Sequence, residues 1–291
     1  LDVAAGSLGE MALEEWDGPV KADRTYHIGW VFPHLQDPAW VGIAYGVFDQ
    51  ARLDGVDLTG YPAGGYGEVT RQITQIEAMI ALGVDLLIGS PVSFEALVPA
   101  FQEAQDAGIP VILHINDCTL EHPTAKVVSA YYNTYGKASA EPVIEDSKEA
   151  RAAGKVVQVG LFPGPGGLAW TGATELGFKD AVTEAGLEDE IDIVAVKWGV
   201  SEAAVQADLI EPVMVAYPEI DYLVGCGPAA TAAIPIVAAA GRVGKTKIVS
   251  TYITQSLYLG IVEGKLLAAP SEWFPRTGRL AVDCAVKYLN G

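Results

Sequence analysis

The stretch YHIGWVFPHLQDPAW, residues 26–40, decides the fold class of this chain. Its first seven residues are mostly apolar and bulky, which is typical of a buried strand, and a polar loop with two prolines follows them. Beyond Trp40 the apolar residues recur at helical spacing, so one face of a helix can lie on a sheet. Parallel α/β sheets bind ligands at the carboxyl ends of their strands, in the loops that lead into helices. The stretch therefore predicts a strand, a ligand-binding loop and a helix, with Asp37 and Trp40 belonging to the loop.

A second loop of the same kind, residues 63–72, has the sequence AGGYGEVTRQ and places Tyr66 near another strand end. Ser90 and Asn116 follow two further apolar runs, at 86–89 and 110–115, whose composition predicts buried strands. Hydroxyl and amide groups in such positions can hydrogen-bond a polar ligand. Rings and polar groups gathered at strand ends indicate a small-molecule site.

Strand, loop and helix repeat along the whole chain. Up to residue 115 the apolar runs alternate with helical patterns, which predicts parallel strands with helices on both faces. The polar segment 116–124 then interrupts the pattern. A second series follows, with expected strands at 126–131, 156–162, 191–196, 222–225, 247–252 and 266–269. The predicted fold class is α/β, with two doubly wound parallel-sheet lobes joined by a hinge.

The break in the pattern also suggests how the chain is divided. We expect an N-terminal arm at residues 1–25, a first lobe at 26–118 plus 251–291, and a second lobe at 119–250. Two similar lobes joined by crossovers would face a common cleft with their ligand loops, which is the arrangement of a hinged clamp.

The charge of the chain limits its partners. Its 18 basic and 37 acidic residues give a formal net charge of −19, which argues against binding to nucleic acid or to anionic membrane surfaces. An acidic surface is equally ordinary for a protein from a salty habitat, so the charge by itself does not indicate a cationic ligand. No apolar run approaches the ~20 residues that a membrane-spanning helix needs.

The sequence contains no recognisable catalytic or metal-binding arrangement. It lacks a P-loop, a nucleophile elbow and a zinc-binding histidine pair. The glycine-rich run at 164–167 follows an expected strand, but Pro165 removes a backbone donor, so a tight loop is favoured over a phosphate cradle. We therefore expect a binding protein without a cofactor, a metal or an enzymatic activity.

Neither the cysteines nor the start of the chain settles its compartment. Cys118, Cys226 and Cys284 form no CxxC pair, and they leave open one disulfide with a spare thiol or three free thiols. The first residues do not have the pattern of a signal peptide, so the sequence is that of a cytoplasmic protein or of a processed, mature chain.

Several motifs resemble the type I periplasmic binding-protein superfamily, and within it the TorT-like sensor proteins of trimethylamine N-oxide. The two most specific ones are PHLQDPAW at 33–40 and AGGY at 63–66, the latter followed by Arg71-Gln72. Weaker similarities lie at 164–178, 220–225, 250–252 and 269–283, so that the resemblance covers about 26–291. Members of the superfamily usually continue beyond a helix end like the one at 288–291. The resemblance implies a periplasmic location and the type I periplasmic-binding-protein fold.

The resemblance also implies which residues bind the ligand. TorT-like proteins surround the methyl groups of their ligand with rings, and by motif these would be Trp40, Tyr66, Tyr132 and Tyr252. Ala39 and Tyr132 stand where the relatives have tyrosine and tryptophan, and Trp170 lies in a loop that differs from theirs. Ring faces attract a positively polarised, methylated nitrogen. With the polar groups described above, the predicted ligand-binding residues are Asp37, Trp40, Tyr66, Ser90, Asn116, Tyr132, Trp170 and Tyr252.

The predicted function is that of a periplasmic solute-binding protein, a monomer that closes on a small polar or methylated solute. It would deliver this solute to an ABC transporter permease or signal its presence to a membrane sensor kinase. A sugar or polyol is the alternative ligand, although few strand-end loops offer the side chains that sugars need. A transcription regulator would need a DNA-binding motif ahead of Tyr26, where residues 1–25 contain only Lys21 and Arg24 as cations. Trp40 can also be a structural anchor at the start of its helix, and Tyr66 an ordinary turn residue.

Overall fold

The computed structural model describes residue 18, residues 20–127 and residues 132–291. The chain forms two compact units. The first unit contains residues 40–131 and 273–291 together with the chain up to Gln36, and the second contains residues 37–39 and 132–272. In the described ranges, no helix combines the length and the apolar character that crossing a membrane requires.

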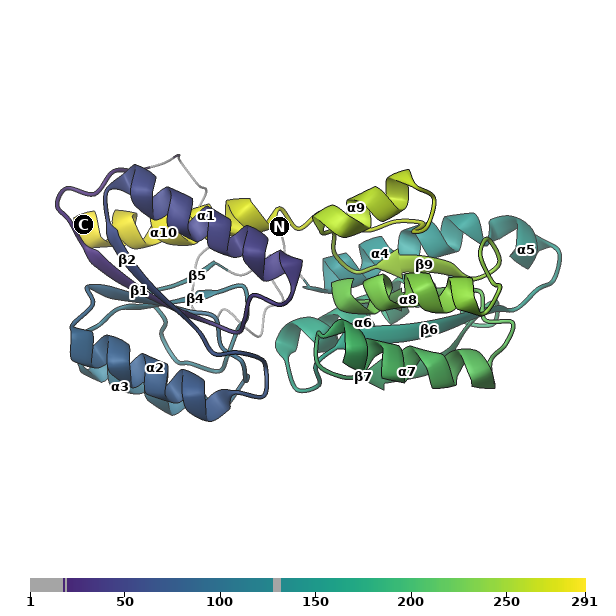
Figure 1. Ribbon diagram of the computed structural model, residues 1–291, viewed down its shortest axis with the longest axis horizontal. Helices are drawn as coiled ribbons and strands as arrows, with labels where there is room; N and C mark the ends of the chain where they lie inside the picture. The colour runs from purple at the N-terminus through teal and green to yellow at the C-terminus, as the bar shows by residue number, and fades with distance from the viewer. Residues whose placement is uncertain (1–17, 19, 128–131) are drawn as a thin grey trace. The chain divides into compact units, whose positions relative to one another are not determined.

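The first unit is built on a five-stranded parallel sheet with the order β2-β1-β3-β4-β5. Its strands are β1 (His27–Phe32), β2 (Asp57–Pro62), β3 (Leu86–Gly89), β4 (Val111–His114) and β5 (Ala125–Val127). Its helices are α1 (Pro38–Asp54), α2 (Val69–Leu82), α3 (Val98–Asp106) and α10 (Phe274–Asn290). Figure 1 shows α1 and α10 side by side on one face of this sheet and α2 and α3 on the other. Because helices cover both faces, β3 and β4 are buried along their whole length.

Two glycines allow α1 and α10 to approach each other closely. A Cβ atom on Gly46 would lie 2.0 Å from the carbonyl oxygen of Pro275, and one on Gly278 would lie 2.3 Å from that of Ile43. Side chains at these positions would push the helices apart, so glycine is required at both. The two helices therefore form one closely packed layer.

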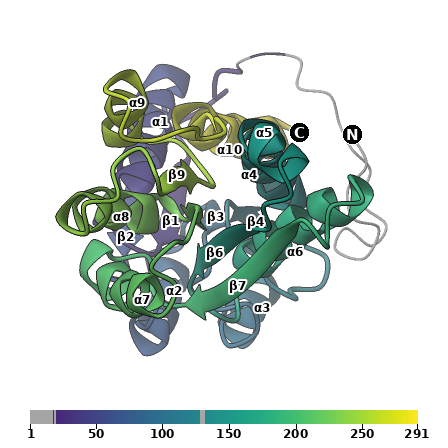
Figure 2. The same ribbon diagram turned by 90° about the vertical axis from the view of Figure 1, so that its right-hand side faces the viewer.

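The second unit is built on a four-stranded parallel sheet with the order β7-β6-β8-β9. Its strands are β6 (Val157–Gly164), β7 (Ile191–Trp198), β8 (Tyr222–Gly225) and β9 (Lys247–Ser250). Its helices are α4 (Tyr132–Asp146), α5 (Lys148–Ala152), α6 (Ala169–Glu184), α7 (Ala203–Ala216), α8 (Gly227–Ala239) and α9 (Gln255–Val262). Figure 2 shows α7 and α8 on one side of the sheet and α4 and α6 on the other. The predicted α/β class and its two doubly wound parallel sheets are confirmed.

The boundaries of the units differ from the expected ones. Of the strand predicted at 126–131, residues 128–131 lie outside the described part of the chain. The described part belongs to β5, which pairs with β4 in the first sheet through Ile112, Leu113 and His114. Residues 251–272 lie in the second unit, and the strand expected at 266–269 is reduced to one bridge between Val249 and Ala268. Both segments are short, so their apolar pattern does not reveal which sheet they join.

Candidate functional site

Three of the predicted ligand-binding residues meet in the first unit, and we call Trp40, Tyr66 and Asn116 the first ring cluster. Trp40 lies in the first turn of α1, Tyr66 in the loop after β2, and Asn116 just beyond β4. The hydroxyl oxygen of Tyr66 accepts from Nε1 of Trp40 at 3.4 Å and from Nδ2 of Asn116 at 3.5 Å. Nδ2 of Asn116 also donates to the carbonyl oxygen of Pro91 at 2.8 Å. Strands that end at one edge of a parallel sheet bring these groups together, as the sequence predicts.

Trp40 is also part of a stack of rings that continues into the core. Trp30 and Phe32 alternate along β1 and therefore point to the same face, with ring centroids 3.8 Å apart and nearly parallel planes. The centroid of Phe32 lies 6.3 Å from that of Trp40, which is only 3% exposed. Trp40 thus supports the fold of the first unit, whatever further role it has. The sequence analysis missed Trp30 and Phe32, although their spacing of two residues in a strand was a usable signal.

Ser90 is buried and its hydroxyl is occupied by protein groups. It accepts from Nε1 of Trp30 at 3.3 Å and lies 3.4 Å from Nδ1 of His114. Burial lowers the pKa of His114 to about 3, so its ring is neutral at neutral pH. His34, whose ring meets the edge of Tyr66 at 5.4 Å, has a pKa lowered to about 4 by burial. Neither histidine supplies a cation to the first ring cluster.

Three further predicted residues meet in the second unit, and we call Asp37, Trp170 and Tyr252 the second ring cluster. The hydroxyl of Tyr252 donates to Oδ2 of Asp37 at 2.5 Å, and the backbone N–H of Ala39 donates to Oδ1 at 2.9 Å. The rings of Trp170 and Tyr252 meet edge to face with centroids 6.4 Å apart. Desolvation by burial raises the pKa of Asp37, although both hydrogen bonds oppose this shift. Among the described residues, no lysine, arginine or histidine forms an ion pair with this carboxylate.

Two glycines provide the space for these rings. A Cβ atom on Gly227, the first residue of α8, would lie 2.5 Å from the Tyr252 ring. One on Gly164 would lie 3.0 Å from the ring of Trp170. The indole Nε1 of Trp170 is buried and has no hydrogen-bond partner in the part of the chain that the structure describes. Such a group is a free donor for a bound molecule.

Three further expectations concern single residues and the glycine-rich run. Tyr132 is the first residue of α4, and its predicted ligand contact stays a prediction because its side chain lies outside the described part of the structure. The hydroxyl of Thr171 donates to the carbonyl oxygens of Pro165 and Leu168, which closes the run at 164–167 into a tight turn. No disulfide bond joins Cys118, Cys226 and Cys284.

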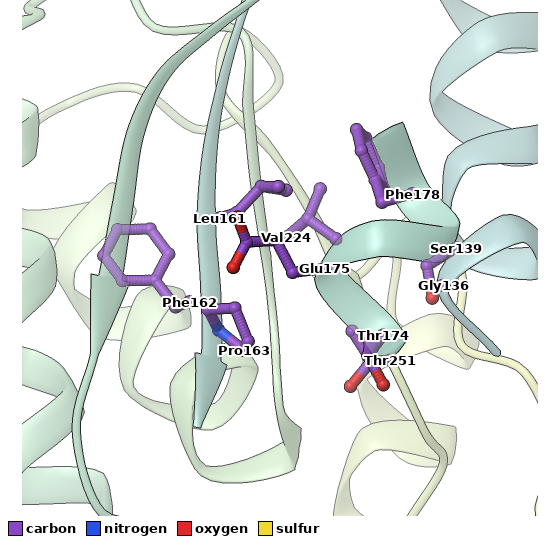
Figure 3. Close-up of a pocket in the computed structure, with 10 residues that line it drawn as sticks. All are labelled: Gly136, Ser139, Leu161, Phe162, Pro163, Thr174, Glu175, Phe178, Val224 and Thr251. Carbon is purple, nitrogen blue, oxygen red and sulfur yellow. The ribbon is translucent and has the colours of Figure 1, made fainter. Parts of the chain in front are cut away.

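A small pocket lies in the second unit, between α4, α6 and the strands β6 and β8 (Figure 3). Its lining is mainly apolar and includes Leu161, Phe162, Val224 and Phe178. The hydroxyl oxygen of Thr251 lines it without a hydrogen-bond partner among the described residues. The described residues that line this pocket include no member of either ring cluster, so the clusters are separate features.

The sequence profile of the family described as "Periplasmic binding protein domain" matches residues 28–291. Periplasmic protein TorT of Escherichia coli K12 is 30% identical over 277 residues, which cover 94% of this chain and 75% of TorT. A structure of the TorS sensor domain–TorT complex in the presence of TMAO gives a TM-score of 0.78 at 26% identity, covering 91% of this chain and 86% of that one.

Two further relatives bind other molecules, according to their names. An ABC transporter solute-binding protein from Bradyrhizobium sp. BTAi1, solved with bound Bis-Tris, is 34% identical with a TM-score of 0.75, covering 94% of this chain and 80% of that one. The D-ribose/D-allose-binding protein of Pseudomonas aeruginosa is 27% identical over 235 residues, which cover 77% of this chain and 69% of that protein. The similarities span both units and confirm the resemblance and the fold that the motifs predicted.

Proposed function

Since the chain belongs to the periplasmic binding protein family, we propose that it binds a small alkylated amine or amine oxide and presents the bound form to a membrane partner. The periplasmic location follows from the family and agrees with the names of its relatives. The family is one of substrate-binding proteins. Two of the relatives support the ligand class, because TorT was solved with TMAO and the Bradyrhizobium protein with Bis-Tris, which is itself a tertiary amine.

The observation that supports this ligand class best is the environment of Asp37. Its carboxylate is buried and lies beside aromatic rings, and within the described ranges its hydrogen bonds come from the neutral groups of Tyr252 and Ala39. A buried carboxylate without a cation is unfavourable, and a positively polarised nitrogen would relieve this cost. Ring faces attract the same kind of group. The second ring cluster thus suits a ligand that is positively polarised and apolar on its outside.

The first ring cluster would contribute shape and apolar surface. Tyr66 presents a ring whose hydroxyl is already held by Trp40 and Asn116, so its position is fixed before a ligand arrives. Fixed groups lose little conformational entropy on binding, which favours affinity. Ser90 is an unsuitable ligand group, since its hydroxyl bonds with the protein.

The output of binding would be a shift in the population of conformations. A ligand that binds one conformation better than another increases its share, and a partner that recognises that conformation then reports on the ligand. For this chain we propose an ABC transporter permease or a membrane sensor kinase as that partner, by analogy with the Bradyrhizobium protein and with the TorS–TorT complex.

A sugar is the second candidate ligand, and one observation favours it. Asp37 and Asn116 are side chains that hydrogen-bond hydroxyl groups well, and the Pseudomonas relative is named for ribose and allose. Both side chains, however, already form hydrogen bonds within the protein, Asp37 with Tyr252 and Ala39, and Asn116 with Tyr66 and Pro91.

Calorimetric titration with trimethylamine N-oxide, glycine betaine, choline and a panel of pentoses separates the two ligand classes. For an alkylated amine, each methyl group replaced by hydrogen should weaken binding by roughly 1 kcal/mol because less apolar surface is buried. Tight binding of one pentose, discrimination between its epimers and indifference to all the amines would reject the proposed ligand class.

A further inference from the structure

The first unit has an exposed surface that is made of aromatic residues and arginines. Its members are Val41, Tyr45 and Phe48 on α1, and Trp273, Arg276 and Arg279 at the start of α10. We call this set the α1–α10 face. It includes no predicted ligand-binding residue.

Helical spacing explains why these residues share one face. Val41, Tyr45 and Phe48 recur at intervals of four and three, so they form a stripe along α1. Phe48 lies at its inner margin, where its ring also meets the buried ring of Trp30 edge to face at 6.2 Å. Val41 is 51% exposed, Tyr45 60% and Phe48 47%. Trp273 on the neighbouring helix is 60% exposed. A contiguous patch of large, exposed apolar side chains is typical of an interaction site.

Two arginines lie over two of these rings. The guanidinium of Arg279 lies 5.7 Å from the ring centroid of Tyr45, and that of Arg276 lies 5.3 Å from the ring centroid of Trp273. Arg279 also pairs with Asp49 at 2.6 Å. Arg276 forms no ion pair with any carboxylate among the described residues. Tryptophan, tyrosine and arginine are the residue types that contribute most to protein interfaces.

The backbone at Trp273 is held in an unfavourable conformation. Its φ of 54° and ψ of 41° lie in the left-handed region, which costs free energy for any bulky side chain. Glycine would adopt this conformation without strain. Trp273 is 60% exposed, and its ring contacts the guanidinium of Arg276, so the ring is available to a partner outside the unit.

The surface is also rigid before any partner binds. Gly46 and Gly278 let α1 and α10 pack backbone against backbone, so the two halves of the face cannot slide past each other. The cation–π pairs fix the rings further. A preformed surface loses little entropy on association.

From these observations we infer that the α1–α10 face docks an acidic, amphipathic protein segment, whose carboxylates meet Arg276 and Arg279 and whose apolar side chains pack on Tyr45, Phe48 and Trp273. Charge complementarity decides the type of partner. The chain has seven arginines and a net charge of −19, and two of these arginines stand one helical turn apart in this face. An acidic segment would be repelled by most of the remaining surface and steered here. An anionic membrane is less suitable, because it would meet the whole negative charge of the protein.

A pair of synthetic amphipathic helical peptides tests this inference with the full chain. Both present a leucine stripe, flanked by glutamates in one and by lysines in the other, and their fluorescence anisotropy is followed during titration with the protein. We expect saturable binding of the glutamate peptide, which weakens as the ionic strength rises. Arg276→Glu should weaken it about tenfold or more, since it reverses the charge at the centre of the face.

Two further variants keep the result interpretable. Trp273→Gly removes the ring while suiting the left-handed backbone, so it should lose binding without loss of stability in a thermal scan. Lys148→Glu makes the same change of charge on exposed α5 of the second unit and should alter binding by less than about twofold.

Several outcomes would overturn the inference. One is that the glutamate peptide shows no saturable binding, and another is that Arg276→Glu and Lys148→Glu affect it equally. Binding to phosphatidylglycerol vesicles in place of the peptide would assign the face to a lipid surface. Sedimentation that reveals a dimer, abolished by Arg276→Glu, would assign it to a second copy of the chain.

Discussion

The two ring clusters are made of similar residues but differ in how their polar groups are satisfied. In the first cluster the hydroxyl of Tyr66 accepts two hydrogen bonds, and the neighbouring histidines are neutral. In the second, Asp37 is a buried carboxylate without a cation, and Trp170 has an N–H without a partner among the described residues. The first cluster is complete by itself, whereas the second gains stability from a bound molecule. We therefore expect the first ring cluster to determine the stability of its unit and the shape of the surface offered to the ligand. We expect the second ring cluster to select the charge of the ligand.

The largest expected effect is on the first cluster, where Trp40→Ala should lower the free energy of unfolding by about 3–5 kcal/mol, because it leaves a cavity beside Phe32. Urea denaturation followed by circular dichroism measures this loss. Trp198→Ala is the matched control, since Trp198 is partly exposed on β7 and its removal should cost less than about 1 kcal/mol. Unchanged stability of Trp40→Ala together with a loss of ligand binding would make Trp40 a ligand wall and break the contrast between the clusters.

The second prediction concerns the negative charge of Asp37. The substitution Asp37→Asn should weaken the binding of a cationic alkylated amine such as choline by roughly 3 kcal/mol, or about 100-fold. The amide keeps the size of the side chain but removes the charge that would pair with the ligand nitrogen. Thermal stability should not fall, because burial already disfavours the charged carboxylate and raises its pKa. Calorimetry measures the affinity. Equal affinities for the two proteins would show that Asp37 does not select charge.

A smaller effect is expected for Tyr252→Phe, which removes the hydroxyl that donates to Asp37 but keeps the ring. The affinity for the same ligand should fall by about 1 kcal/mol, or roughly fivefold, because the carboxylate is held less firmly. Tyr66→Phe is the matched control in the first cluster, where the hydroxyl accepts bonds from Trp40 and Asn116 and, in the described ranges, forms no hydrogen bond with Asp37. A larger loss for Tyr66→Phe than for Tyr252→Phe would reverse the roles assigned to the two clusters.

Much of the fold could be predicted from the sequence because buried parallel strands are apolar along their whole length. The runs that became β3, β4 and β8 are bounded by polar or turn residues, which makes them visible. The strand β5 has three residues and is only partly buried, so its pattern could not say which sheet it joins. The loop that contains Tyr66 was visible for the same reason as the strand before it, whereas Trp40, expected in a loop, lies in the first turn of α1.

The arrangement of the site was less predictable, because it depends on pairs that are distant in the sequence. The bond between Tyr252 and Asp37 joins residues 215 positions apart, and no local pattern shows it. The space for the Tyr252 ring depends on Gly227, which looks like an ordinary residue at the start of a helix. Ser90 lies where the sequence places it, but only the structure shows that its hydroxyl is used by Trp30 and His114.

The smallest expected effect concerns the buried carboxylates of the first unit, which contrast with Asp37. Nε2 of Gln50 donates to Oδ1 of Asp54 at 2.8 Å and to Oδ1 of Asp283 at 2.9 Å, which joins α1 to α10. Burial, and then the charge of Asp54, raise the pKa of Asp283 to about 7. Other charged groups face the pair as well, namely Lys21, whose charge acts on Asp54, and Arg279, whose guanidinium donates to Gln50. A proton shared between Asp54 and Asp283 would relieve the repulsion between their two carboxylates. For Asp37, we propose that a ligand relieves the cost of burying a single carboxylate.

Because folding raises this pKa above its value in the unfolded chain, the folded state binds the proton more tightly than the unfolded state does. The contribution to stability is therefore full below pH about 4 and is lost as the pH rises through about 7. Urea denaturation between pH 4 and pH 8 measures the free energy of unfolding of the native chain and of Asp283→Asn. Carboxylates elsewhere contribute equally to both proteins and therefore cancel in the difference. Relative to the variant, the native chain should lose stability as the pH rises over this window. A difference that does not change with pH would mean that Asp54 and Asp283 share no proton. The first unit would then hold two buried negative charges, as the second unit holds the single charge of Asp37.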